Sequence, residues 1–127
     1  MEYFIMLGIV VFMAIADFLT GFIKSNVLGT VSSKVMRTGG LKKFAEILIM
    51  IVSIVLEIGL KQLGKYYSGC EQYASVIGTV TAIMVFVYII MMELISILEN
   101  YLAICPEAKW ASKLLKKLKN VDTAEQQ

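Results

Sequence analysis

The sequence predicts an all-α integral membrane protein with three transmembrane helices and a basic amphipathic C-terminal helix. Hydrophobic residues make up 58% of its 127 residues, against about 45–50% in soluble domains. Three long apolar segments follow one another with short gaps, and most lysines and arginines gather in the first gap and the tail. Because the chain has no internal repeat or low-complexity linker, we expect one domain over residues 1–127.

The three apolar segments are long enough to cross a bilayer. Residues 3–23 contain one charged side chain and reach about 30 Å as a helix, the thickness of the hydrocarbon core. Residues 44–60 are short but within the usual range, and residues 73–98 are long enough to span with tilt. Between the first two segments, valines at every fourth position indicate a short interfacial helix that ends in a turn or hinge at Gly39-Gly40.

The last part of the chain, residues 101–127, is expected to form a basic cytoplasmic tail. Pro106 is the single proline, and we expect it to end the third helix. Residues 109–121 predict an amphipathic helix with lysines on one side and apolar residues, Trp110 among them, on the other. Such a helix suits an anionic inner membrane surface. The alternative is a solvated tail that opposes aggregation.

The placement of the basic residues predicts the orientation. Positive charge favours the cytoplasmic side, and three spans put the first loop and the tail on the same side. We therefore expect the N-terminus outside and the C-terminus inside. Because the first residues lack the basic region of a cleavable signal peptide, the first segment should remain in the mature protein. The residues expected at the inner membrane surface are Lys24, Lys34, Arg37, Lys42, Lys43, Trp110, Lys113, Lys116 and Lys117.

Each apolar segment carries polar residues at helical spacing down one face. Inserting a carboxylate near the bilayer centre costs roughly 2.5–3.5 kcal/mol of free energy, so the presence of these stripes requires an explanation. They either face one another inside an assembly or face water in a pore, and both readings describe a protein that works by associating. The candidate residues for pore lining or assembly are Asp17, Thr20, Gly21, Glu46, Ser53, Glu57, Glu93, Ser96 and Asn100, with Lys24 and Met50 on the same stripes.

Two carboxylates, Asp17 and Glu93, are expected to be the deepest, in the inner leaflet at comparable depth. Neither has a basic residue one turn away. We therefore expect both to pair with polar groups on another helix, or to stay protonated through desolvation.

The other two carboxylates of the stripes have basic residues close by. Glu46 is expected near the inner end of its helix and Glu57 near the outer end, and the pairs Lys42–Glu46 and Glu57–Lys61 have i,i+4 spacing. Simple interfacial ion pairs are therefore an alternative to a functional role for these two residues.

The small residues and the cysteines are less informative about function than the polar stripes. Gly78 and Ala82 form a small-xxx-small pair that allows close helix approach. Cys70 should lie near the outer surface and Cys105 near the inner one, so we expect free thiols or a Cys70 bridge between chains. The chain has no histidine and no catalytic or metal-binding motif, so we expect no enzyme, no metal and no other cofactor.

The order of motifs resembles the toxin-secretion/phage-lysis holin family over nearly the whole chain. The matching residues are Asp17-x-x-Thr20-Gly21, Ser32-Ser33, Gly39-Gly40, Lys42-Lys43, the stretch Glu93-Leu94-Ile95-Ser96-Ile97-Leu98-Glu99-Asn100, then Pro106 and a lysine-rich tail. One departure is the absence of a glycine from Tyr101 to Cys105, which bears on the flexibility of that linker.

The resemblance implies a holin, which collects in the host cytoplasmic membrane and associates at a set time into lesions. Its partners would be membrane lipid, further copies of itself, and an endolysin or toxin that passes without a stable complex; nucleic acid is not expected. The residues alone leave two alternatives open. One is a small ion channel or transporter subunit that uses the intramembrane carboxylates, and the other is a structural subunit of a larger membrane complex.

Overall fold

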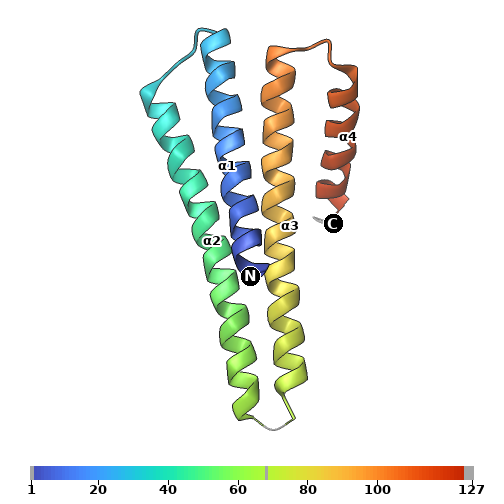
Figure 1. Cartoon of the computed structure of the whole chain (residues 1–127). Helices are drawn as coiled ribbons and strands as arrows, with labels where there is room; N and C mark the ends of the chain where they lie inside the picture. Colours follow the sequence, from blue (N-terminus) through green and yellow to red (C-terminus); the bar gives the residue numbers. More distant parts are fainter. Residues whose placement is uncertain (1, 68, 125–127) are drawn as a thin grey trace.

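A computed structural model describes residues 2–67 and 69–124, which form four helices (Figure 1). These are α1 (Glu2–Val27), α2 (Ser33–Tyr66), α3 (Glu71–Ile104) and α4 (Lys109–Ala124). The first three helices alternate in direction, and α4 folds back along α3. Because α1 is shorter than its neighbours, the α2–α3 hairpin extends beyond the start of α1. The prediction of an all-helical fold is confirmed.

The bundle is apolar outside and partly polar inside. Large hydrophobic side chains face outward along α1, α2 and α3, as at Phe4 (82% exposed) and Met84 (66% exposed). Only 17% of the most apolar stretch of α1, and 22% of that of α3, is buried. The core helix of a soluble protein would be mostly buried, so this arrangement favours a lipid environment. The buried polar residues of the described chain are Asp17, Ser53, Glu57, Glu93 and Asn100.

A small apolar core holds α1, α2 and α3 together midway along the bundle. It consists of Val10 from α1, Met50 and Ile54 from α2, and Ile89 from α3. Val10 and Met50 are fully buried. This core separates two groups of polar side chains, one on each side of it along the helices.

Within the described residues, two helices are long and apolar enough to cross a membrane, namely α1 and α3. α2 also contains an apolar middle, but it carries charged residues toward both ends. It is much longer than the predicted segment 44–60 and runs unbroken through Gly39-Gly40, so the predicted break there is wrong. A glycine inside a helix costs only about 1 kcal/mol relative to alanine, and elongation of an existing helix outweighs that cost.

Glycines set two turns, at Gly29 and Gly69, and two close approaches between α2 and α3, at Gly64 and Gly78. Gly29 adopts a φ of 65° after the end of α1, where the Thr30 amide donates to the Ser25 carbonyl at 2.9 Å. Gly78 packs α3 onto α2, because a Cβ at this position would lie 3.1 Å from the Glu57 Cα. Ala82, one turn further along α3, is fully buried.

The C-terminal helix packs on α3 through its apolar side. Ala111 is fully buried, and the Trp110 ring lies 5.7 Å from the Tyr101 ring, centre to centre. Lys119 forms an ion pair with Glu99 at 2.6 Å. α3 ends at Ile104, two residues before Pro106, as the sequence predicted. Residues 125–127 of the predicted tail lie outside the described residues.

Candidate functional site

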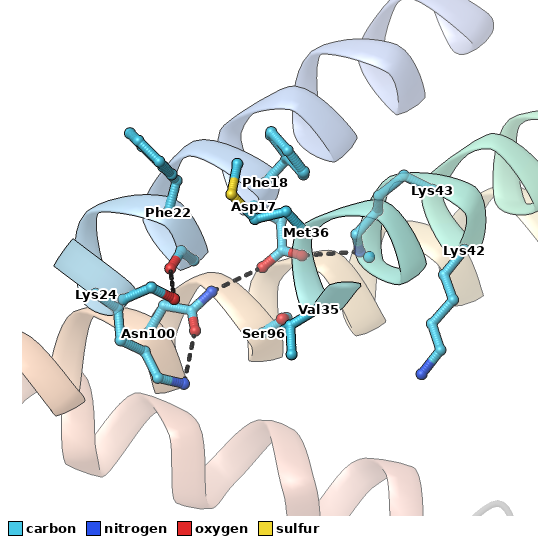
Figure 2. A pocket seen from close by; sticks show the side chains of 13 residues that line it. Asp17, Phe18, Phe22, Lys24, Val35, Met36, Lys42, Lys43, Ser96 and Asn100 are labelled. Carbon is cyan, nitrogen blue, oxygen red and sulfur yellow. Dashed lines mark hydrogen bonds and ion pairs between the residues drawn. The ribbon is translucent and has the colours of Figure 1, made fainter. Parts of the chain in front are cut away.

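Three carboxylates converge on one lysine where α1, α2 and α3 meet. The Lys43 Nζ lies 2.8 Å from Asp17 Oδ2, 2.7 Å from Glu93 Oε2 and 3.3 Å from Glu46 Oε2. We call these four residues the Lys43 cluster. The Glu93 side chain is 1% exposed and that of Lys43 is 19% exposed. Ion pairs from α2 to α1 and α3 therefore tie three helices together inside the bundle, and Figure 2 shows the Lys43–Asp17 pair.

The Lys43 cluster contains more negative than positive charge. An ammonium group has three donors and no acceptor, whereas three carboxylates offer six oxygens. Glu93 Oε1 is buried without a hydrogen bond. Glu46 Oε2 lies 3.3 Å from the Lys43 Nζ, but the geometry of this contact is not that of a hydrogen bond. Buried oxygens without donors are costly. The cluster thus has unused acceptor capacity that water, or a donor on another helix, would satisfy.

An asparagine from α3 continues this network toward the end of the bundle. The Asn100 amide donates to Asp17 Oδ1 at 3.1 Å and to the Thr20 hydroxyl at 3.3 Å. Its oxygen accepts a hydrogen bond from Lys24 at 3.1 Å (Figure 2). Gly21 faces this amide, because a Cβ there would make an ordinary van der Waals contact with Asn100 Nδ2, at 3.5 Å. The polar stripes of α1 and α3 therefore face each other.

A second polar group, which we call the Glu57 cluster, lies on the other side of the apolar core. Glu57 Oε1 pairs with Lys61 at 2.5 Å and accepts a hydrogen bond from the Thr79 hydroxyl at 2.9 Å. The Lys61 ammonium also donates to the Tyr3 hydroxyl at 3.3 Å. Glu57 is 4% exposed, so this cluster likewise joins α1, α2 and α3.

The two clusters are separated by the same interval on α1, α2 and α3. Asp17, Glu57 and Glu93 each lie 14 residues from a member of the other cluster, namely Tyr3, Lys43 and Thr79 respectively. At 1.5 Å per residue, 14 residues of helix span about 21 Å. The bundle therefore has two polar layers about 21 Å apart with an apolar layer between them.

The structure corrects two predicted positions. Lys43, predicted at the membrane surface, lies inside the bundle, and it takes the place predicted for Lys42 as the ion-pair partner of Glu46. The physical reason is the helical repeat: Lys43 lies seven residues before Met50 and 14 before Glu57, so it continues their buried stripe. Lys42 points away from the cluster (Figure 2).

The other predicted residues have varied surroundings. The Ser53 hydroxyl is buried but donates to the carbonyl of Met50 on its own helix at 2.8 Å. Ser96 is half-buried beside Asn100. The predicted surface residues that are exposed are Lys34, Arg37, Lys42, Trp110, Lys113, Lys116 and Lys117.

Sequence reasoning missed Tyr3, Thr79 and the central position of Lys43. The signal was present, because each lies two heptads from a residue already on a stripe. Among the described residues, no group of histidines, cysteines and acids has the arrangement of a metal site. The charges inside the apolar bundle form ion pairs and hydrogen bonds between helices.

Comparison with known families gave one match. A family model described as "Bacteriophage holin family" matches residues 2–121, which include all four helices except the last residues of α4. Comparisons with curated proteins and with solved structures gave no match.

Proposed function

Because this chain belongs to the bacteriophage holin family, a non-enzymatic family of membrane pore-forming proteins, we propose that it oligomerises in the bacterial cytoplasmic membrane. Its oligomers form lesions that let an endolysin, or a toxin, leave the cell. The observation that carries this proposal is the burial of the Lys43 cluster inside a bundle with an apolar exterior.

The described bundle corresponds to the closed state of the protein. In it, lipid contacts the apolar exterior while the polar stripes satisfy one another. An open state turns the same stripes toward water, which removes the cost of buried carboxylates and supplies donors to Glu93 Oε1. A protein with these two packings is able to accumulate harmlessly and then open.

We place α1, α2 and α3 across the membrane with the N-terminus outside. The apolar layer between the two clusters supports this position for α2, although α2 is less apolar than its neighbours. Clusters about 21 Å apart fit within a hydrocarbon core of about 30 Å, each about 5 Å from a boundary. The Lys43 cluster then lies in the inner leaflet and the Glu57 cluster in the outer one. The membrane potential acts on the charges of both clusters: moving one elementary charge across the membrane changes the free energy by about 2.3 kcal/mol per 100 mV.

The test is expression in a bacterium with and without a cytoplasmic endolysin, while a cytoplasmic reporter protein is followed in the medium. A holin gives abrupt lysis after a delay, with reporter release, only when both proteins are present. Depolarisation with the reporter retained would instead identify a small-ion channel that uses the carboxylates. A chain that has no effect when expressed alone and copurifies with a membrane complex would be a structural subunit.

A further inference from the structure

A cavity of about 510 Å³ opens between α1 and the first turns of α2, beside the Lys43 cluster. Four apolar side chains line one part of it: Phe18, Phe22, Val35 and Met36. Lys24 and Lys42 are among the polar residues around the rest (Figure 2). Gly39 also lines the cavity, and a Cβ added there would meet nothing within 4 Å. The cavity therefore combines an apolar wall with a basic rim.

The two lysines at this rim have no anionic partner among the described residues. Within the described part of the chain, Lys24 donates only to the neutral Asn100 amide, at 3.1 Å. Lys42 is exposed and has no ion pair with any described residue. Asp17, the one acid in the lining, is already matched by Lys43 at 2.8 Å and by Asn100 at 3.1 Å. The site thus offers two cations to an anion that the chain does not itself provide.

We propose that this cavity binds one anionic phospholipid of the inner leaflet. Lys24 and Lys42, which Figure 2 shows on opposite sides of the cavity, reach toward the phosphate with their flexible side chains, and the upper part of an acyl chain lies along Phe18, Phe22 and Val35. The apolar wall favours a lipid over free phosphate, because a soluble ion gains nothing from these side chains. Basic pockets between helices at the cytoplasmic side suit such headgroups. Lipid held here bridges α1 and α2 next to the Lys43 cluster.

The inference goes beyond the proposed function, and its test does not depend on lysis. Phosphatidylglycerol, phosphatidylcholine and glycerol 1-phosphate are titrated separately into the full chain in a neutral detergent. Bound lipid is counted by native mass spectrometry, and the thermal midpoint is followed by circular dichroism. We expect one phosphatidylglycerol per chain and a raised midpoint, weak binding of phosphatidylcholine, and no effect of glycerol 1-phosphate.

Two pairs of variants distinguish lipid binding in the cavity from general electrostatic attraction between the basic protein surface and the lipid. Lys24→Gln with Lys42→Gln should weaken phosphatidylglycerol binding about 30-fold, since each lysine contributes about fivefold at an anionic surface. The matched control, Lys34→Gln with Arg37→Gln, removes the same charge from the same end of the bundle but outside the cavity lining, and should keep the bound lipid. Gly39→Leu should abolish binding by filling the cavity with all charges intact, whereas Gly59→Leu should not.

Equal losses in the two charge-matched pairs would overturn the proposal in favour of non-specific attraction. Binding that survives Gly39→Leu, or displacement of the lipid by glycerol 1-phosphate, would also overturn it. Helical content measured on every variant shows that a loss of binding is not a loss of folding. A protein that binds the lipid but fails the lysis test would leave this inference intact and remove the proposed function.

Discussion

At the scale of single residues, Lys43 holds a position that no other basic residue of the described chain shares. It contacts carboxylates on α1, α2 and α3 at once. Removing one partner of a buried ion pair is strongly destabilising, because the remaining charge stays buried without compensation. Lys43 therefore supplies the positive charge that the carboxylates of the three polar stripes share inside the bundle.

We predict that Lys43→Gln destabilises the bundle by about 3–5 kcal/mol, because it leaves three carboxylates without a counter-ion. Lys65→Gln, on the exposed far end of the same helix, should change stability by less than about 0.5 kcal/mol. The measurement is loss of helical signal during denaturation in detergent. Equal stability of the two variants would show that the Lys43 cluster contributes nothing to folding.

Neutralising a carboxylate of the cluster should alter when the protein opens more than how much accumulates. Asp17→Asn and Glu93→Gln keep the shape of each side chain but remove the charge that Lys43 offsets. We expect altered lysis timing at normal membrane levels, measured by culture density and immunoblotting beside the exposed-site control Glu107→Gln. Normal schedules for both variants would refute the role of the stripes.

At the scale of elements, the contact between α2 and α3 depends on small residues. Gly64 and Gly78 both lie where a Cβ would approach the other helix within about 3.1 Å. Ala82, one turn beyond Gly78 on α3, is fully buried. Close approach of this kind gives dense packing where lipid supplies no hydrophobic driving force between helices.

Gly78→Leu should therefore separate α2 from α3 and cost about 1–3 kcal/mol, the usual range for overpacking. Gly59→Leu places the same side chain on α2 away from the contact with α3, where a Cβ meets nothing within 4 Å. It should be neutral or slightly stabilising, because leucine favours the helix over glycine. Denaturation curves compare the two variants. Similar midpoints would mean that the contact between α2 and α3 tolerates the added volume.

At the scale of the whole molecule, the two clusters define two polar layers, and the exposed cysteines lie beyond them at opposite ends. Cys70 is in the α2–α3 turn, and Cys105 follows α3 at the other end (Figure 1). The turn between α2 and α3 lies outside the cell in the proposed orientation, so these two thiols are natural reporters of sidedness.

We predict that a membrane-impermeant maleimide labels Cys70, but not Cys105, on intact cells before lysis. Opening the cells should make Cys105 reactive as well. Cys70→Ser and Cys105→Ser assign each signal to one thiol. Labelling of Cys105 alone from outside would reverse the orientation, and labelling of both from outside would mean that α3 does not cross the membrane.

Much of the fold could be predicted from the sequence. The apolar segments 3–23 and 73–98 lie within α1 and α3, and Pro106 follows the end of α3. The sequence also predicted the ion pair of Glu57 with Lys61. It predicted that Asp17 and Glu93 would each pair with a group on another helix. The course of α2 through Gly39-Gly40 was not, because local glycine preference was outweighed by the surrounding helix.

The sequence by itself determined that this chain is helical, apolar on most faces and striped with polar groups, because hydrophobicity and the 3.6-residue repeat are local properties. Only the tertiary structure decided that Lys43 rather than Lys42 meets Asp17, Glu46 and Glu93. It also decided that Tyr3 and Thr79 meet at the Glu57 cluster. Neighbouring lysines differ by about 100° around a helix, and which of them faces inward depends on how α2 is rotated against α1 and α3.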